Sequence, residues 1–308
     1  MKETLKLSFQ MTDTLSRIEH NGLKINLDTL KEIEKEYENE MNTLENKLRE
    51  LAKKAMGDTP INLASPDDKS VLLYSRKVRD KNLWSLTFNL GHEMRGNTIK
   101  PKMRTRMKHT DFVRHVRRMT DIVYKTVGNQ CKDCGGTGRV RLPRKDGSLG
   151  KAKRICKTCM GKGVVYTSTG EVAGFKLIPR TIRDTAAAGF KTDKTTLEDR
   201  LSELEGDARE FCSAYSRYNA LRTYLSTFVE GMKNNVDDDN FIHPEFMQCV
   251  TATGRLSSRN PNFQNMPRGS TFAIRKVVES RFDGGFILEG DYSQLEFRVA
   301  GFLARDSQ

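Results

Sequence analysis

The sequence predicts an α+β fold in which helices dominate the first part, short antiparallel strands lie near the end, and a small four-cysteine module is inserted between helices. Three observations predict this fold. Apolar residues between positions 28 and 56 recur every three or four residues, which is typical of an amphipathic helix. A Cys-x-x-Cys pattern occurs twice. Residues 276–288 are rich in apolar and β-branched side chains around a glycine-containing turn, which indicates two strands or a strand pair around that turn.

The long helix is predicted from seven apolar positions that have Glu and Lys residues between them. These positions are Leu30, Ile33, Tyr37, Met41, Leu44, Leu48 and Leu51. Such spacing places all seven side chains on one face of a helix and the charged side chains on the other. We therefore expect this helix to bury one face along its whole length.

Asp291 lies where the predicted strand ending at Leu288 gives way to a helix. The helix is indicated by apolar residues at helical intervals, Leu295, Val299, Phe302 and Leu303. A carboxylate at such a junction can face a cleft and bind a hard cation through oxygen. The alternative is purely structural: Ser293 and Glu296 form a capping box, and Asp291 is an ordinary turn residue.

Four ordered motifs carry a resemblance to a known family. They are Thr253-Gly254-Arg255-Leu256-Ser257-Ser258, then Pro261-Asn262-Phe263-Gln264-Asn265-Met266-Pro267, then Ile274-Arg275, and finally Asp291-Tyr292-Ser293-Gln294-Leu295-Glu296-Phe297-Arg298. Their order and separations resemble the palm domain of the family A DNA polymerases, including phage enzymes. The resemblance implies a helical thumb followed by a partial palm of antiparallel strands and helices.

Weaker likenesses extend the resemblance toward the N-terminus. Residues 11–28 resemble the entry to the polymerase thumb, and residues 62–74 resemble a Ser-Pro segment with the helix behind it. The resemblance implies thumb helices over 1–90, helices returning from thumb to palm over 186–240, and a partial palm over 241–308. Residues 91–185 are left as an insertion into the thumb.

The insertion carries all the excess positive charge of the chain. Residues 91–180 contain 22 Lys and Arg against 6 Asp and Glu, whereas the rest of the chain contains 31 against 34, and the net charge is +13. Phosphate neutralisation is one use for such a segment. A solvated basic surface and a protein partner such as a processivity factor are the alternatives. The cations are Arg104, Arg106, Lys108, Arg114, Arg117, Arg118, Arg139, Arg141, Arg144, Lys145, Lys151, Lys153 and Arg154.

Two Cys-x-x-Cys-x-Gly-x-Gly repeats lie inside the insertion. Cys131 and Cys134 form the first pair, and Cys156 and Cys159 form the second. Four thiolates in two pairs are the ligand set of a tetrahedral structural zinc site. A disulfide pair or a redox Cys-x-x-Cys is the alternative. Cys212 and Cys249 lack such a pattern and are expected to be packed thiols.

The resemblance implies roles for individual palm residues. Asp291 is expected to bind the catalytic Mg²⁺ ions, with the Tyr292 carbonyl taking part, and Glu296 to lie against the sugar of the incoming nucleotide. Four residues are expected to contact the minor groove of the primer–template DNA, where every base pair offers similar acceptors. These residues are Arg255, Asn262, Gln264 and Asn265.

The family's second metal-binding carboxylate and its fingers helix have no counterpart in the short segment after Asp291. We therefore expect an N-terminal portion of a DNA-directed DNA polymerase, a nucleotidyltransferase of DNA replication, that is inactive alone. Deoxyribonucleoside triphosphates are the substrates of the complete enzyme, and a second polypeptide with the fingers and remaining palm is a further expected partner. The alternative function is a non-catalytic DNA-binding zinc protein or processivity subunit.

Composition excludes several other classes. Charged residues make up 30% of the chain and the mean hydropathy is -0.63. No apolar run approaches the ~18 residues of a membrane span, and the N-terminus has no charged-then-apolar signal segment. We therefore expect no membrane partner and a cytoplasmic location in a bacterial or phage-infected cell, where the six cysteines are thiols or metal ligands.

Overall fold

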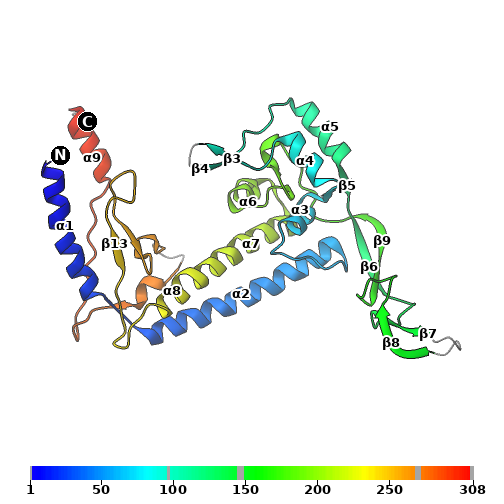
Figure 1. The fold of residues 1–308 in the computed structure, drawn as a ribbon, viewed down its shortest axis with the longest axis horizontal. Helices are drawn as coiled ribbons and strands as arrows, with labels where there is room; N and C mark the ends of the chain where they lie inside the picture. Colours follow the sequence, from blue (N-terminus) through cyan, green and yellow to red (C-terminus); the bar gives the residue numbers. More distant parts are fainter. Residues whose placement is uncertain (1, 96–97, 144–148, 268–271, 306–308) are drawn as a thin grey trace. The chain divides into compact units, whose positions relative to one another are not determined.

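The computed structural model describes residues 2–95, 98–143, 149–267 and 272–305, and it has the predicted α+β fold (Figure 1). The chain forms two compact units. Unit 1 consists of Met1–Glu40 and Leu221–Gln308, and unit 2 of Met41–Ala220. Helices α2 (Leu27–Met56) and α7 (Gly206–Tyr224) contribute residues to both units.

Helix α2 confirms the predicted amphipathic helix. It begins after Asn26, whose side-chain oxygen accepts a hydrogen bond of 2.9 Å from the backbone N–H of Thr29. This contact satisfies one of the N–H groups that lack a partner in the first turn of a helix. The predicted apolar face is buried, with Leu30 and Leu48 at 1% and 0% exposure.

Unit 1 combines a small sheet with short helices. Its further elements are α1 (Lys2–Asn21), β1 (Leu23–Ile25), η3 (Leu225–Val229), α8 (Glu230–Lys233), β12 (Phe241–Ile242), β13 (Glu245–Met247), β14 (Ser257–Arg259), η4 (Phe263–Asn265), η6 (Ile274–Val277), β15 (Val278–Glu279) and α9 (Leu295–Ala304). The sheet order is β12-β1-β15, and both pairings are antiparallel. One sheet therefore joins a strand from the start of the chain to two strands from its last third.

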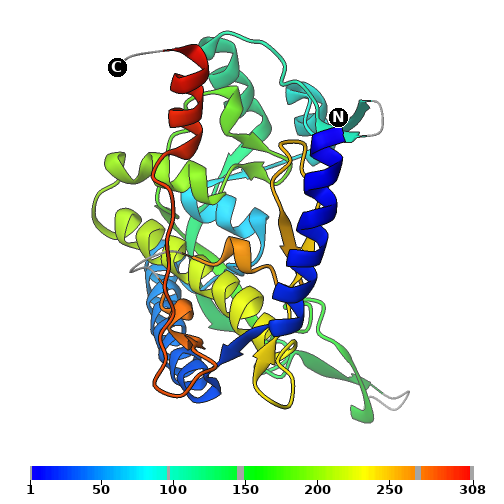
Figure 2. The same cartoon turned by 90° about the vertical axis from the view of Figure 1, so that its left-hand side faces the viewer.

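The core of unit 1 is built around aromatic rings. The ring of Tyr224 stacks on that of Phe272 at a centroid distance of 4.3 Å, and Tyr37 meets Tyr224 edge-on at 5.2 Å. Helix α1 lies beside the β13–β14 hairpin (Figure 2). There the Glu19 carboxylate accepts a hydrogen bond of 2.5 Å from the backbone N–H of Phe246. These contacts hold the hairpin that leads into the motif residues.

Of the two strands predicted on either side of residues 283–285, only the first is present, as β15, and the predicted strand pair is wrong. A turn is present, because the Gly285 N–H donates to the Phe282 carbonyl at 2.9 Å. However, β15 pairs with β1 instead, with Ile25 opposite Val278. Residues 286–288 form no strand, and their apolar side chains are exposed. The local composition of residues 286–288 favours a strand. Whether a segment forms a strand also depends on a distant partner strand with a free edge, which local composition does not reveal.

Unit 2 contains the remaining helices and strands. They are α3 (Pro66–Tyr74), β2 (Arg76–Val78), α4 (Lys81–Phe88), β3 (His92–Arg95), β4 (Thr98–Pro101), α5 (His109–Met119), β5 (Thr120–Ile122), β6 (Tyr124–Gln130), β7 (Arg139–Pro143), β8 (Leu149–Ile155), β9 (Val164–Val172), η1 (Ile182–Asp184), β10 (Thr185–Ala186), β11 (Gly189–Phe190), α6 (Lys194–Arg200) and η2 (Leu201–Glu203). Helix α3 lies where the Ser-Pro segment predicts it, and the Ser65 hydroxyl caps it.

The core of unit 2 includes part of the predicted insertion. Phe112 and Val116 of α5 are 1% and 5% exposed and pack with Trp84, whose Nε1–H donates to the Ala186 carbonyl at 2.9 Å. Strand β5 pairs with β2, which precedes residue 91. Residues 109–122 are therefore integral to this core. The assignment of thumb, insertion and palm by residue range stays a prediction.

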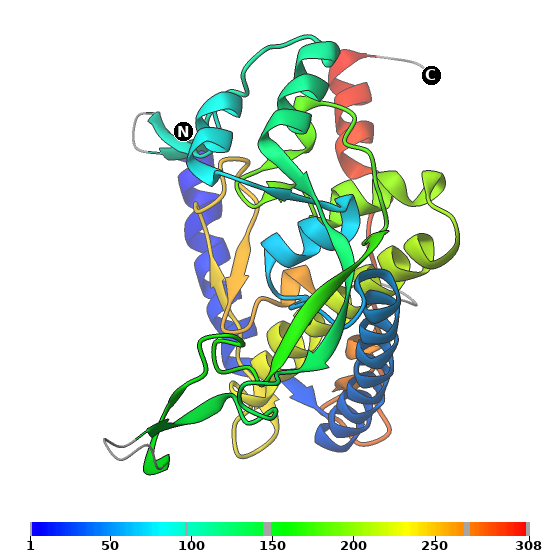
Figure 3. The same cartoon turned by 90° about the vertical axis from the view of Figure 1, so that its right-hand side faces the viewer.

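Beyond the core, the chain runs out along β6, forms the β7–β8 hairpin and returns along β9 (Figure 3). The β6–β9 ribbon is antiparallel, with Gln130 opposite Val164. No helix in the described part of the chain is long and apolar enough to cross a membrane.

Candidate functional site

All seven palm residues singled out in the sequence line one cleft in unit 1. The cleft has a volume of about 1290 Å³. Its lining includes Asp291, Tyr292, Glu296, Arg255, Asn262, Gln264 and Asn265. These residues come from β14 and its approach, from the η4 turn and from the segment around the start of α9. The fold thus brings together motifs that are separate in the sequence.

The η4 turn is held by a buried hydroxyl that the sequence analysis gave no role. Ser258 is 2% exposed, and its Oγ donates to Asn262 Oδ1 at 3.1 Å and accepts from the Gln264 N–H at 3.3 Å. Asn262 Oδ1 also accepts from the Asn265 N–H at 3.3 Å. The side chains of Gln264 and Asn265 remain exposed. One serine therefore fixes the backbone that presents three amides to the cleft.

Glu245 holds the other end of this turn. It lies directly opposite Arg259 in the β13–β14 hairpin and accepts hydrogen bonds from Arg259 Nε at 2.6 Å and from Asn260 Nδ2 at 2.9 Å. These contacts, from Asn260 first and then from Arg259, lower the pKa of Glu245. A cross-strand partner of this kind leaves no local sequence signal, which is why it was missed.

Asp291 and Tyr292 lie in the extended segment that precedes α9. Asp291 lines the cleft and is exposed, and the Tyr292 side chain is 79% exposed. Helix α9 confirms the helix predicted from Leu295, Val299, Phe302 and Leu303. Arg298 donates from Nε to the Ser293 carbonyl at 3.0 Å, so it buttresses the turn into this helix.

The structural alternative, a capping box of Ser293 and Glu296, is not present. Helix α9 starts after Gln294, which adopts a left-handed φ of 53° and makes no side-chain cap. The Glu296 carboxylate instead forms an ion pair with the guanidinium of Arg255. The Glu296 carboxylate binds Arg255 rather than the backbone N–H at the start of α9, because a hydrogen bond between two charged groups is stronger than one to a neutral N–H.

Arg275 is a further cation of this cleft. Its Nη1 donates to Glu289 Oε1 at 3.0 Å, while its Nε is buried and has no hydrogen-bond partner among the described residues. In the sequence, Arg275 carries no signal beyond its place in a motif. The cleft therefore offers two carboxylates, four side-chain amides and two guanidinium groups within one concave surface.

The four cysteines of the two repeats form a buried cluster in unit 2. Their sulfur atoms all lie within 4.8 Å of one another. The Cys131 and Cys156 sulfurs are 3.8 Å apart, and those of Cys134 and Cys159 are 3.6 Å apart. A disulfide needs about 2.05 Å. A regular tetrahedron with metal–sulfur bonds of about 2.3 Å has edges of about 3.8 Å, so the thiols fit a closed four-coordinate ion.

Backbone hydrogen bonds pair the two repeats symmetrically. The Cys131 N–H donates to the Gly163 carbonyl at 2.8 Å, and the Cys156 N–H donates to the Gly138 carbonyl at 2.9 Å. Gly138 has a φ of 70°, and a Cβ there would lie 2.1 Å from the Gly161 carbonyl oxygen. Glycine is required at this position because only glycine permits both the backbone angle and the close approach.

The remaining cysteines differ from each other. Cys212 is 0% exposed, as expected of a packed thiol, and burial raises its pKa to about 12. Cys249 is exposed in a bend with a φ of 61°, so the expectation that it is packed is wrong. The exposure of Cys249 could not be predicted from the sequence, because a single cysteine outside a repeated motif gives no signal of burial or exposure.

The β7–β8 hairpin gathers basic residues beside the cysteine cluster. Arg141 is directly opposite Lys153, and Arg139 is opposite Ile155. Residues opposite each other in an antiparallel pair point to the same face. Three cations and an exposed isoleucine therefore share one face, while Val140 on the other face packs against the cysteines. Arg144 and Lys145 lie outside the described residues, as does the side chain of Lys151.

Comparison with known proteins agrees with the motifs. Residues 169–308 match the model of DNA polymerase family A. A DNA polymerase of Bacillus phage SP01 is 32% identical over 168 residues, which are 52% of this chain and 18% of that protein. DNA polymerase I of Treponema pallidum is 41% identical over 120 residues, 38% of this chain and 11% of that protein. The chain thus spans less than a fifth of the length of these relatives.

A solved structure of the POL domain of Pol1 from M. smegmatis, in complex with DNA primer-template and dNTP, aligns with 96% of this chain and 33% of its own. The TM-score is 0.46 and the sequence identity is 19%. All residues that line the motif cleft lie within the segment that matches the family model. Residues 169–308 belong to family A of the DNA polymerases.

Proposed function

We propose that the chain supplies the thumb and the first part of the palm of a template-dependent DNA-directed DNA polymerase acting in replication. The observation that carries the proposal is the convergence of all seven motif residues on one cleft. The bacterial and phage relatives support a setting in the cytoplasm of a bacterial or phage-infected cell. Primer–template DNA and deoxyribonucleoside triphosphates are the proposed partners of the complete enzyme.

The donor set at Asp291 fits magnesium. Mg²⁺ prefers carboxylate, carbonyl and water oxygens, and Asp291 offers an exposed carboxylate beside the backbone carbonyl of Tyr292. When bound, two such ions stabilise the charge that develops during phosphoryl transfer. The proposed role of Asp291 is to hold them within the cleft.

Three amide residues are proposed to test the primer–template. Asn262, Gln264 and Asn265 line the cleft on a turn that Ser258 fixes from below. Amide side chains can both donate and accept, so they suit the acceptors that every base pair presents in the minor groove. Arg255 adds a positive charge that favours the phosphate-rich duplex.

Glu296 is proposed to limit which sugar the enzyme accepts. The residue lies in the first turn of α9 and lines the same cleft as Asp291. Its ion pair with Arg255 fixes the carboxylate over the cleft, where it would clash with a 2′-hydroxyl. In this proposal, Arg255 contacts the minor groove and Glu296 tests the sugar of the nucleotide. The ion pair between the two side chains couples these roles.

The cysteine cluster is proposed to hold a structural zinc ion. Four buried thiols at tetrahedral separations leave no open position for a substrate. N–H groups of Gly138 and Gly163 donate to the Cys134 and Cys159 sulfurs at 3.3 and 3.2 Å, which holds these two sulfur atoms in place. The ion would thus supply folding energy to a module that has little apolar core.

The β7–β8 hairpin is proposed to bind the DNA backbone. Arg141 and Lys153 are like charges placed directly opposite each other, an arrangement that destabilises an isolated ribbon. A phosphate between them would convert this repulsion into attraction. A processivity factor with an acidic surface is the second candidate for this face, because the same charges would attract it.

The test uses the purified chain with a labelled primer–template. We expect binding by fluorescence anisotropy and no primer extension, because two-metal chemistry needs carboxylates from two places. Adding a polypeptide with the fingers and second carboxylate should restore extension, and Asp291→Ala should abolish it with little change in DNA affinity. Asp283→Ala is the matched control, because Asp283 lies in the same exposed segment and does not line the cleft. Absence of DNA binding would refute the proposal and favour a role without nucleic acid.

A further inference from the structure

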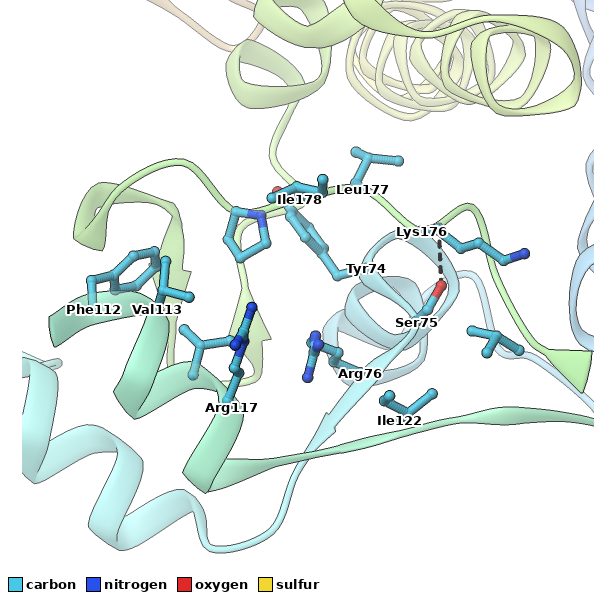
Figure 4. Close-up of a pocket in the computed structure, with 13 residues that line it drawn as sticks. Tyr74, Ser75, Arg76, Phe112, Val113, Arg117, Ile122, Lys176, Leu177 and Ile178 are labelled. Atoms are coloured by element: carbon cyan, nitrogen blue, oxygen red, sulfur yellow. Dashed lines mark hydrogen bonds between the residues drawn. The ribbon is translucent and has the colours of Figure 1, made fainter. Parts of the chain in front are cut away.

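A second cavity lies in unit 2. It has a volume of about 370 Å³ and is lined by the end of α3, the start of β2, one face of α5 and the segment 176–179 (Figure 4). This volume lies within the range of roughly 300–1,000 Å³ that is usual for ligand pockets. Neither the cysteine cluster nor the motif cleft contributes to it.

The floor and rim of the cavity are apolar. Phe112, Val113 and Val116 line it from α5, and Leu177 and Ile178 from the facing segment. Ile178 is 77% exposed and Ile122 is 44% exposed. Large apolar side chains that stay exposed beside a cavity are a feature of binding surfaces.

Two guanidinium groups share the cavity with these apolar side chains. Arg117 projects from α5 and Arg76 from β2, and both end in the opening, whereas the Lys176 side chain extends away from them (Figure 4). Arg76 donates from Nη1 to the Thr120 hydroxyl at 3.2 Å. Within the described residues, neither arginine forms an ion pair with a carboxylate.

The acidic residues on neighbouring elements are already paired elsewhere. Asp111 pairs with Arg114 at 3.2 Å, Asp121 with Arg79 at 2.7 Å, and Glu171 with Lys125 at 2.6 Å. These three carboxylates are therefore already paired, and the guanidinium groups of Arg76 and Arg117 are available to bind an external anion.

The wall of the cavity is held in an unusual backbone conformation. Ser75 and Lys176 have φ angles of 58° and 59°, in the left-handed region that non-glycine residues rarely adopt. The Lys176 N–H donates to the Ser75 hydroxyl at 2.9 Å, which ties the two residues together. Such conformations persist where surrounding structure fixes them, and they occur often at binding sites. The cavity is therefore preformed.

We propose that this cavity binds a short acidic peptide of a partner protein, with one large apolar side chain in the pocket and flanking carboxylates on Arg76 and Arg117. Arginine binds carboxylates bidentately and is the usual residue for such recognition. A nucleic acid is the less suitable occupant, because a phosphate backbone gains nothing from an apolar floor. The proposal does not depend on the polymerase activity.

The probe is a fluorescein-labelled peptide, Asp-Asp-Phe-Asp-Asp with blocked ends, titrated with the full chain at constant salt. We expect saturable binding that is lost when Phe is replaced by Ala or when the four Asp are replaced by Asn. Arg117→Gln should weaken binding by about tenfold, since it removes one charge-assisted contact. Ile178→Ser should also weaken binding while leaving the charge unchanged.

Arg114→Gln is the matched control, because Arg114 lies one turn away on α5, carries the same charge and does not line the cavity. It should change the affinity by less than twofold. Circular dichroism should be the same for all variants. Equal weakening by Arg114→Gln, equal binding of the Ala or Asn peptide, or displacement of the peptide by an oligothymidylate of equal charge through Arg117 would overturn the proposal.

Discussion

The guanidinium of Arg255 and the carboxylate of Glu296, two residues that are 41 positions apart in the chain, form an ion pair between two motifs. Both side chains are more than 70% exposed, so the pair lies at the surface of the cleft rather than in a core. Exposed pairs contribute little to stability. The Arg255–Glu296 pair therefore matters for position and not for stability, because it sets where the Glu296 carboxylate lies over the cleft.

The first prediction concerns sugar discrimination in a full-length or reconstituted enzyme. Glu296→Ala should raise ribonucleotide relative to deoxyribonucleotide incorporation by about tenfold or more, because steric rejection by one side chain is worth roughly 1–3 kcal/mol. Single-nucleotide kinetics with both sugars measure the ratio. Asp283→Ala is the control, because Asp283 lies in the same exposed segment and does not line the cleft. Unchanged discrimination in the Glu296 variant would restrict this residue to its contact with Arg255.

The second prediction concerns the metal. The chain should hold one zinc ion, and Cys134→Ser should release it, because loss of one thiolate opens a closed coordination shell. Mass spectrometry of the metal content measures the release, and hydrogen exchange should rise in β6 to β9 while α2 stays protected. Cys249→Ser should keep the metal, since Cys249 is exposed and lies outside the cluster. Full metal content in the Cys134 variant would exclude this ligand set.

The third prediction separates DNA binding from stability in the hairpin. Replacing Arg141 and Lys153 by Gln should weaken DNA binding and reduce the slope of log K against log salt by about 1.8, at about 0.9 for each phosphate contact. Removal of opposed like charges should leave the module as stable or slightly more stable. Deletion of 91–185 is unsuitable, because it removes Phe112 and Val116 from the core of unit 2.

The control for this experiment changes Arg49 and Lys54 on α2 to Gln, which removes the same number of positive charges. Both residues are already paired with carboxylates, Glu45 and Asp207. Anisotropy titrations between low and moderate salt give the slopes. An unaltered slope in the hairpin variant, together with lost binding to an acidic replication protein, would assign the hairpin to a protein partner.

The fourth prediction concerns alkaline pH. Burial raises the pKa of Tyr74 from 10.0 to about 12. The folded chain therefore keeps this proton at pH values where the unfolded chain has lost it. Stability from this residue is complete below pH 10 and falls as the pH rises toward about 12, by on the order of 2 kcal/mol. Tyr74→Phe should show a smaller loss between these pH values in urea unfolding, whereas an equal loss would assign the effect to other groups.

Local patterns predicted the helices and the cysteine cluster correctly. The spacing of Leu30 to Leu51 and of Leu295 to Leu303 determines which face of a helix is apolar, and α2 and α9 follow it. Likewise, a duplicated Cys-x-x-Cys pattern predicts that its four cysteines lie together, as they do in the structure. These features depend on residues that are close in sequence or that repeat a motif.

Features set by distant partners were not predictable in this way. Glu296 pairs with Arg255 and does not cap its own helix. Strand β15 pairs with β1 rather than with residues 286–288. Ser258 gains its role only after the η4 turn folds over it. The family resemblance identified which residues gather in the cleft, but no pattern in the chain specified the contacts that hold them there.

The paired hydrogen bonds between the two cysteine repeats have a consequence for how the module forms. Cys131 and Cys156 each donate to a glycine carbonyl of the other repeat, Gly163 and Gly138 respectively. Each half therefore completes the backbone of the other, and a single repeat leaves a donor and an acceptor open. Each repeat carries a donor at its first cysteine and an acceptor at its last glycine, so the meeting of the two repeats satisfies both pairs of groups. In the full chain, the hairpin joining the halves makes that encounter intramolecular, and assembly no longer depends on concentration.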